Sequence, residues 1–402
     1  MKTFPHRVAL VTGGLQFGGS TTFLIHLASG LRSAGIACEV FSLAQDNPFS
    51  ADFAAASIPV HVWNESRFIF EDRMAQMCRA IVRFKPSVVI ANIGRDAYET
   101  LRYVPEGIAR IGVIHDRIMD PHHLVTTYGD FMDHVVVVAS HLISDVHAAA
   151  TAATCSCVLH GIPIPTDMPS RTANLAEPLK LIYFGRLAEG KGSRIFPQMI
   201  DALHQRRLPF RWTIHGCGPD ESYLRQRLAV EAASGEVVFS TPTTREKLHA
   251  LVREHDVYVL ASEIEGGPLT LLEAMALGLV PICGDIPCMV QEVINAENGF
   301  RVPRDKPEAY ADALDHLHKN RPLLEKMSRA AQQTITSNFT TAAMAQRYIT
   351  LFDQIKLPVA PADWPARFEI QSILATPYPW LSLPPFRALR RGLKQIRSVI
   401  PL

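Results

Sequence analysis

Two basic side chains, Arg186 and Lys191, stand five residues apart in a short glycine-containing segment that follows an apolar run. The arginine offers a planar fork to phosphate oxygens and the lysine a mobile point charge, so together they can neutralise a diphosphate. The segment nearly matches the P-loop of nucleoside triphosphatases, but that loop needs Ser or Thr directly after its lysine, where Gly192 stands. The ordinary alternative to a diphosphate site is a pair of solvated cations on a loop.

Two carboxylates, Glu265 and Glu273, flank a Gly-Gly-Pro turn and the expected start of a helix. The amides of Leu269, Thr270 and Leu271 then lie at a helix N-terminus, where backbone N–H groups can bind a phosphate. Both carboxylates can point at one ligand and accept hydrogen bonds from sugar hydroxyls. The alternative is that both are acids favoured by the helix dipole, which suits Glu265 better than Glu273 among its apolar neighbours.

Glycine turns supply further candidate contacts to a ligand. The stretch 13–19 ends in Gly18 and Gly19 and opens a helix, and its spacing departs from the G-x-G-x-x-G of dinucleotide-binding proteins. Gly216 and Gly218 stand in another turn, between an expected strand and an expected helix. Glycines there let the backbone approach a ligand closely, although packing alone could also require them.

The elements that must position these turns alternate between short β-rich runs and helical patterns, which predicts parallel sheets with crossover helices. The expected strands cover 8–12, 37–42, 88–92, 111–115, 135–139, 179–184, 211–215, 257–261 and 280–283. In open sheets of this kind, ligands bind outside the carboxyl ends of the strands. Each segment named above follows such an end.

Two domains of ordinary size fit a chain of 402 residues that is 48% hydrophobic. A proline-rich stretch at 160–178 has little apolar periodicity and marks the boundary between them. We expect an N-terminal doubly wound α/β domain at 1–165 and a C-terminal one at 178–356, facing each other across a cleft. Helices at the end of the second domain and a tail at 357–402 complete the expected architecture.

Charge and cysteine usage narrow the partners and the compartment. Lys and Arg total 40 against 39 for Asp and Glu, so no global field selects nucleic acid as a partner. Seven cysteines without a repeated spacing indicate a reducing, cytoplasmic compartment. Cys155 and Cys157 have no second Cys or His pair at ligand spacing, so we expect no metal site and interpret both as buried strand residues. The sequence also lacks an apolar run long enough to span a bilayer, which leaves peripheral attachment open.

The tail carries a basic amphipathic pattern. Residues 371–402 contain no acidic side chain, and apolar positions repeat at three and four from Phe386 to Ile400, with arginines and a lysine between them. A helix at 386–400 can lie on an anionic membrane, which for a cytoplasmic protein is the inner face of the cell membrane. Docking on the first domain would use the same apolar stripe equally well. A membrane-bound tail would favour a lipid-linked acceptor.

Together these motifs resemble the retaining glycosyltransferases of the GT-B fold, in the large family-four group. The segment 265–273 fits the family's motif of Glu, seven residues and Glu, and it runs on into Ala-Met-Ala-x-Gly. The resemblance extends in order through the glycines before the first helix, Gly185-Arg186 with Lys191-Gly192, Gly216-x-Gly218-Pro219 and Asn298-Gly299. Gly267 departs from the aromatic residue often found there, and His160-Gly161 replaces the usual Asn-Gly.

The resemblance implies a role for each candidate residue. Arg186 and Lys191 would hold the donor diphosphate, and Glu273 would accept hydrogen bonds from the ribose hydroxyls. Glu265 would contact the transferred sugar, and His115, at the end of an expected strand, would hydrogen-bond it. The other implied donor contacts come from Gly18, Gly19, Gly216, Gly218, Leu269, Thr270 and Leu271.

The expected function is a hexosyltransferase of polysaccharide biosynthesis that moves a sugar from a nucleotide-diphosphate donor to a glycan, lipid-linked or small-molecule acceptor, with retained anomeric configuration. Arg186, Lys191 and the helix start at Leu269 would stabilise the leaving group, without a metal or another cofactor. Two alternatives stay open: a nucleotide-sugar epimerase of the same fold, which needs no acceptor, and a non-catalytic nucleotide-sugar-binding module. Spacing does not reveal which base or sugar is bound.

Overall fold

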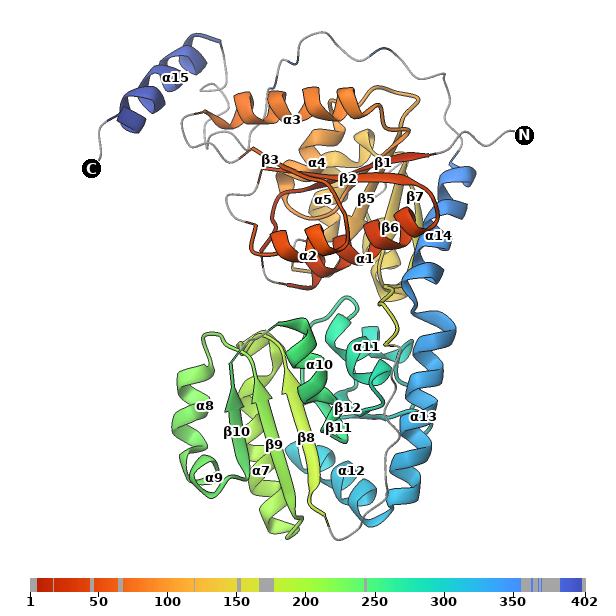
Figure 1. Cartoon of the computed structure of the whole chain (residues 1–402), viewed down its shortest axis with the longest axis vertical. Coiled ribbons are helices and arrows are strands. Elements are labelled where there is room, and N and C mark those ends of the chain that lie inside the picture. The colour runs from red at the N-terminus through yellow and green to blue at the C-terminus, as the bar shows by residue number, and fades with distance from the viewer. Residues whose placement is uncertain are drawn as a thin grey trace. The chain divides into compact units, whose positions relative to one another are not determined.

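The computed structural model describes residues 6–355 apart from 17, 44–46, 64–67, 119, 150–152, 166–176 and 242–243, together with 363, 368, 370 and 384–399. The chain divides into two compact units, Met1–Gly161 with Thr341–Leu402, and Ile162–Thr340. Each unit is an α/β fold with its own parallel sheet (Figure 1).

A seven-stranded parallel sheet forms the centre of the first unit, with strand order β3-β2-β1-β4-β5-β6-β7. Its strands are β1 (Arg7–Thr12), β2 (Ala37–Ser42), β3 (Val60–Val62), β4 (Val88–Ala91), β5 (Ala109–Ile114), β6 (His134–Val137) and β7 (Thr154–Cys157). The direction of winding reverses between β1 and β4. Such a switch point is where open parallel sheets bind ligands.

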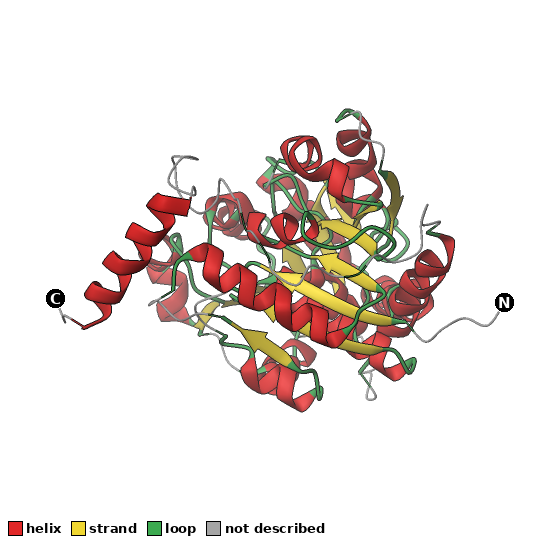
Figure 2. Ribbon diagram, turned by 90° about the horizontal axis from the view of Figure 1, so that it is seen from above, coloured by secondary structure: helices red, strands yellow, loops and turns green. Residues whose placement is uncertain are grey.

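Helices surround this sheet because each has one apolar face to bury. They are α1 (Gly19–Ser33), α2 (Ser50–Ala55), α3 (Phe70–Phe84), α4 (Arg95–Leu101), α5 (Pro121–Tyr128), α6 (Ile143–His147) and α14 (Thr341–Gln354). A further helix, α15 (Pro384–Val399), contacts α3 instead. In α1 the apolar side chains Leu24, Leu27, Ala28 and Leu31 recur at spacings of three and four residues, and all four are fully buried. Figure 2 shows the strands inside and the helices outside.

The second unit repeats this design around a six-stranded parallel sheet of order β10-β9-β8-β11-β12-β13. Its strands are β8 (Leu179–Phe184), β9 (Phe210–His215), β10 (Val237–Ser240), β11 (Val257–Leu260), β12 (Val280–Gly284) and β13 (Phe300–Val302). Its helices are α7 (Phe196–Gln205), α8 (Glu221–Arg227), α9 (Ala229–Ser234), α10 (Arg245–Arg253), α11 (Leu269–Ala276), α12 (Pro307–Lys319) and α13 (Arg321–Asn338). The switch point lies between β8 and β11.

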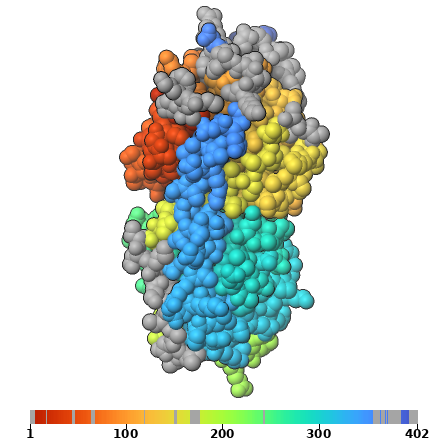
Figure 3. Space-filling model, turned by 90° about the vertical axis from the view of Figure 1, so that its right-hand side faces the viewer, coloured from red at the N-terminus to blue at the C-terminus, as the bar shows by residue number. Residues whose placement is uncertain are grey.

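The division differs from the expected one at its C-terminal end. The pattern up to residue 356 was expected to belong to the second domain, but α14 is part of the first unit, where it packs on α1. The contact is close because Gly30 of α1 has no side chain: a Cβ there would lie 2.7 Å from the Thr341 carbonyl oxygen and 2.9 Å from the Ala345 Cβ. Figure 3 shows the blue surface of α14 against the red N-terminal residues of the same unit.

Two smaller expectations also change. Cys155 and Cys157 lie on a strand, as predicted, but they are half-buried because β7 is at the edge of its sheet. α15 contacts α3 in the first unit through ion pairs of Arg390 and Arg391, so basic side chains take part in the docking of this helix. Within the described part of the chain, no helix is long and apolar enough to cross a membrane.

Candidate active site

The loop after β8 carries the two predicted cations, Arg186 and Lys191, and it follows a buried strand. β8 ends just before Gly185, and the next residue, Arg186, is exposed. Glu189–Lys191 then form one turn of 3₁₀ helix, which Gly192 closes with φ +67°. A Cβ on Gly192 would lie 1.9 Å from the Ala261 carbonyl oxygen. Glycine therefore lets the loop approach the end of β11.

Lys191 and Glu265 meet at the switch point of the second sheet. Lys191 Nζ lies 2.6 Å from Glu265 Oε1, and Ser262 Oγ donates to the same oxygen at 2.8 Å. The two turns are also joined by the Glu263 amide, which donates to the Gly190 carbonyl oxygen at 3.1 Å. The side chain of Glu265 is 11% exposed and that of Lys191 is 34% exposed. The ion pair is therefore partly shielded from solvent, and a ligand can contact it through Lys191.

The start of α11 follows these turns and carries no competing negative charge. Pro268 is its N-cap, no side chain caps the first turn, and that turn holds no acid. The Leu269 and Thr270 amides donate to no residue that the structure describes, whereas Leu271 donates to the Pro268 carbonyl oxygen at 3.0 Å. The predicted trio of anion-binding amides is thus reduced to two, because the tight first turn uses the third.

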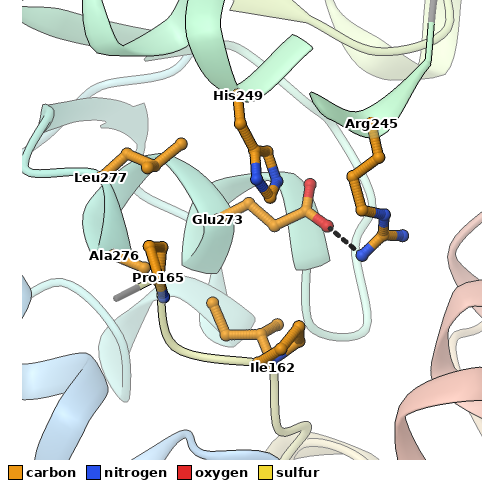
Figure 4. Close-up of a pocket in the computed structure, with 8 residues that line it drawn as sticks. Ile162, Pro165, Arg245, His249, Glu273, Ala276 and Leu277 are labelled. Carbon is orange, nitrogen blue, oxygen red and sulfur yellow. Dashed lines mark ion pairs between the residues drawn. The ribbon is translucent and has the colours of Figure 1, made fainter. Parts of the chain in front are cut away.

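Glu273 lies in a separate pocket of the same unit. Figure 4 shows its carboxylate pointing toward Arg245, whose Nη1 lies 3.6 Å from Glu273 Oε1, and His249 from the same helix lies beside them. Burial raises the pKa of Glu273 above its ordinary value, although the positive charge of Arg245 opposes the shift. Burial, Arg245 and Arg253 lower the pKa of His249. The pocket is lined by Ile162, Pro163, Pro165, Arg245, His249, Glu273, Ala276 and Leu277.

The glycines after β9 serve the packing of neighbouring turns. A Cβ on Gly216 would lie 1.9 Å from the Gly185 carbonyl oxygen, and one on Gly218 would lie 2.2 Å from that of Leu187. The Leu187 amide also donates to the Cys217 carbonyl oxygen at 2.9 Å. These glycines therefore hold the β8 loop, with Arg186, against the β9 turn.

In the first unit, His115 lies at the carboxyl end of β5 and is held by Asn92 from the end of β4. The distance from His115 Nε2 to Asn92 Oδ1 is 2.6 Å, and Asn92 Nδ2 donates to the Ser20 carbonyl oxygen at 3.2 Å. Because Oδ1 can only accept, Nε2 of His115 carries the hydrogen. Burial, with a contribution from His160, lowers the pKa of His115 to about 3. His115 is therefore neutral, and its Nδ1 can accept a hydrogen bond.

The predicted glycine turn opens α1 next to this histidine network. Gly18 and Gly19 are exposed, no side chain caps the helix, and its first turn holds no acid. Through Ser20, Asn92 connects this helix start to His115. The helix N-terminus can therefore receive an anion.

Sequence reasoning missed several residues at both sheet edges. Asn92, Ser262, Arg245 and His249 belong to no motif, and three of them follow a strand or open a helix at the ligand edge, which is the signal that could have identified them. His249 gives no such signal, because only the turn of α10 brings it to Glu273. Among the described residues, no group of three or more His, Cys, Asp or Glu side chains is placed to hold a metal ion.

Comparison with known proteins finds a family match in the second unit. Residues 167–334 match the family model of the glycosyl transferases group 1. A GDP-mannose:cellobiosyl-diphosphopolyprenol alpha-mannosyltransferase of Xanthomonas oryzae pv. oryzae is 31% identical over 181 residues, 44% of this chain and 48% of the relative. The putative colanic acid biosynthesis glycosyltransferase WcaL of Salmonella typhimurium is 28% identical over 188 residues, 44% of this chain and 46% of the relative. The matched chain thus spans about half the length of these relatives.

Solved structures extend the likeness to both units. Anabaena Alr3699/HepE, crystallised with UDP and glucose, superposes with a TM-score of 0.71 at 18% identity, covering 87% of this chain and 99% of the other. TarM of S. aureus gives a TM-score of 0.72 at 11% identity, covering 87% and 100%. At such identities the likeness establishes the fold.

The two Rossmann-like units define a protein of the GT-B fold, which confirms the predicted fold class. The match of residues 167–334 to the glycosyl transferases group 1 falls on the family that the motifs of this chain resemble.

Proposed function

We propose that this chain is a retaining hexosyltransferase that moves a sugar from a nucleotide-diphosphate donor to a glycan or lipid-linked acceptor during polysaccharide biosynthesis. The observation that carries the proposal is the contact of Lys191 with Glu265 beside the open start of α11. A cation, two amides and a carboxylate converge there at the switch point of the sheet. This combination suits a diphosphate joined to a sugar.

The donor diphosphate is assigned to Arg186, Lys191 and the Leu269 and Thr270 amides. Fixed positive groups at the leaving phosphate stabilise the charge that develops as its bond to the sugar breaks. Glu273 is assigned to the ribose, because its pocket also holds Arg245, a donor that can share the ribose hydroxyls. Gly18 and Gly19 keep the proposed role of bringing backbone to the donor. Gly216 and Gly218 act on the donor indirectly, because they hold the β8 loop that carries Arg186.

The transferred sugar is assigned to Glu265 and His115. Glu265 accepts from sugar hydroxyls on the oxygen that Lys191 and Ser262 leave free, and neutral His115 accepts on Nδ1. For retention, the acceptor hydroxyl approaches from the side of the leaving phosphate. The bond from the anomeric carbon to phosphate breaks, the acceptor oxygen takes its place, and the hydroxyl proton passes to a phosphate oxygen. No metal or further cofactor takes part in this scheme.

The relatives suggest an order in which to try donors and acceptors. GDP-mannose comes first because two relatives are named for it, and UDP sugars follow because UDP occupies similar folds. A polyprenol-linked diphosphosaccharide is the first acceptor class for the same reason. Such an acceptor would place the enzyme peripherally at the inner face of the cell membrane.

The function is tested by incubating the purified full chain with guanosine, uridine and adenosine diphosphate sugars and measuring nucleotide release with and without a lipid-linked acceptor. We expect release from one donor, accelerated by the acceptor, and a product with the donor's anomeric configuration. Sugar interconversion without release would identify an epimerase. Binding of a nucleotide sugar without either reaction would identify a binding module, and both results would contradict the proposal.

A further inference from the structure

Basic side chains of α15 pair with the start of α3 in the first unit. Arg390 Nη1 lies 2.7 Å from Glu71 Oε1, and Arg391 Nε donates to Asp72 Oδ2 at 2.8 Å. Glu71 is buried and Arg390 is partly buried, so their attraction is screened less than that of an exposed pair. These two pairs set which face of α15 turns toward α3.

The apolar positions described in α15 are open to solvent. Leu389 is 61% exposed and Phe386 is 37% exposed. Figures 1 and 2 show α15 at the margin of the first unit, next to the C-terminal end of the chain. A helix on a protein surface normally packs its apolar residues inward, and this one turns arginines inward instead. Exposed Leu and Phe on a basic helix indicate a surface that binds something else.

The start of α3 lies at the ligand edge of the first sheet. Arg73, which follows Asp72 on α3, donates from Nη1 to the carbonyl oxygens of Trp63 and Leu43, at 3.3 and 3.5 Å. Trp63 follows β3 and Leu43 follows β2, so both carbonyls mark carboxyl ends of strands. The ion pairs therefore hold α15 near the edge where sheets of this class bind their ligands.

A hollow of about 610 Å³ lies between α15 and α3. Its lining mixes apolar side chains with charged ones, among them Phe68, Ala75, Phe368, Ile370, Arg79 and Arg387. Apolar and cationic groups meet in the same way at the boundary between lipid headgroups and acyl chains.

We propose that α15 and the start of α3 form a docking surface for an anionic lipid bilayer. Phe386 and Leu389 enter the headgroup boundary, and the pairs to Glu71 and Asp72 hold the helix with this face outward. The choice of lipid rests on charge: residues 371–402 hold four arginines, one lysine and no acid, so the tail keeps a net positive charge after Arg390 and Arg391 pair with Glu71 and Asp72. The inference depends on the proposed function only for its purpose, which is to bring a lipid-linked acceptor to the ligand edge.

The proposal is tested by sedimenting the full chain with vesicles of phosphatidylcholine alone and with added phosphatidylglycerol. We expect binding only with the anionic lipid, weakened by salt because exposed charges are screened. Phe386→Ser with Leu389→Ser should lower the bound-to-free ratio at least about tenfold, since each substitution removes apolar surface from the insertion. Equal binding by this variant, or binding that ignores lipid charge, would overturn the proposal.

Further measurements distinguish lipid docking from other causes of lost vesicle binding. Ile118→Ser with Val230→Ser removes exposed apolar side chains elsewhere, 74% and 78% exposed, and should leave vesicle binding unchanged. Nucleotide release from a soluble donor should be unchanged in the α15 variant, so a chain inactive in every assay would refute the proposed function and not the docking surface. If the wild type is a dimer without lipid and the α15 variant a monomer, the surface binds a second copy and the lipid proposal is wrong.

Discussion

Arg186 is a cation whose position has no evident structural use. It is exposed, and its guanidinium forms no ion pair with a residue that the structure describes. We predict that Arg186→Ala lowers nucleotide release about 100-fold, the scale of losing one preorganised charge at a leaving group, with an unchanged melting temperature. Arg211→Ala is the matched control, because Arg211 is exposed near the opposite end of the neighbouring strand. Equal losses in both variants would contradict the assignment.

Glu273 should make nucleotide binding depend on pH. Its pKa is raised, mainly by burial, so the folded protein favours the protonated carboxyl, and this contribution to stability is lost as pH rises through the raised pKa. In its proposed role, the ionised carboxylate of Glu273 accepts hydrogen bonds from two ribose hydroxyls. Affinity for the nucleoside diphosphate should therefore rise with pH across the same window, measured by calorimetric titration.

Two variants show which residue causes the pH dependence of nucleotide binding. Glu273→Gln should bind the nucleotide more weakly and with little pH dependence, whereas His249→Gln should keep the dependence of the wild type. The second variant is needed because His249 also lies in the pocket and its own pKa is lowered. If Glu273→Gln kept the full pH dependence, Glu273 would not be the titrating ribose ligand.

Residues within one motif could be predicted from the sequence, and residues that packing alone brings together could not. Lys191 and Glu265 were placed on turns at the same sheet edge, and the structure joins them. Both Glu265 and Glu273 were expected at one ligand, but their side chains have different neighbours. Arg245 reaches Glu273 from another helix, a contact that no local spacing encodes.

At the scale of elements, the β8 loop depends on one glycine. Gly192 has φ +67°, and a Cβ there would overlap the Ala261 carbonyl oxygen. Gly192→Ala should lower stability by about 1–3 kcal/mol and displace Lys191, with loss of nucleotide release. Gly190→Ala, two residues earlier, meets nothing within 4 Å and should behave as wild type in melting and turnover. Similar behaviour of the two variants would show that the loop does not need the close approach.

The contact of α14 with α1 predicts that replacing a glycine of α1 by alanine destabilises the protein, the opposite of the usual effect in a helix. Replacing a glycine inside a helix by alanine normally stabilises it by about 1 kcal/mol. Gly30→Ala should instead destabilise the first unit, because its Cβ would overlap the Thr341 carbonyl oxygen. Gly392→Ala in α15 meets no neighbour within 4 Å and should not lower the melting temperature. A more stable Gly30→Ala protein would contradict this packing.

The strands and helices near the sheet centres were predictable because buried parallel strands are continuous apolar runs. The short strands β3, β10 and β13 were missed, since edge strands are brief and only partly buried. The assignment of α14 was also beyond the sequence. Its apolar stripe fits either unit, and only the glycine at the contact with α1 shows which one it joins.

At the scale of the whole molecule, the family match and the most specific motifs fall in the second unit. A diphosphate and a ribose need fixed charges and amides at fixed spacing, and such a pattern can be recognised in a sequence. The first unit offers His115, Asn92 and an open helix start, which do not specify an acceptor. Its ligand therefore has to be inferred from surfaces such as α15 rather than from a motif.

The central claim is that the contact of Lys191 with Glu265 marks a site for a nucleotide-diphosphate sugar. The most direct measurement is nucleotide release from the donor panel by the wild type and by Lys191→Ala, with Lys180→Ala as control, since Lys180 lies at the far end of the strand that precedes the loop. We predict release from one donor, about 100-fold slower in Lys191→Ala and unchanged in Lys180→Ala. Full turnover by Lys191→Ala, or no release from any donor by the wild type with a lipid-linked acceptor present, would contradict the account.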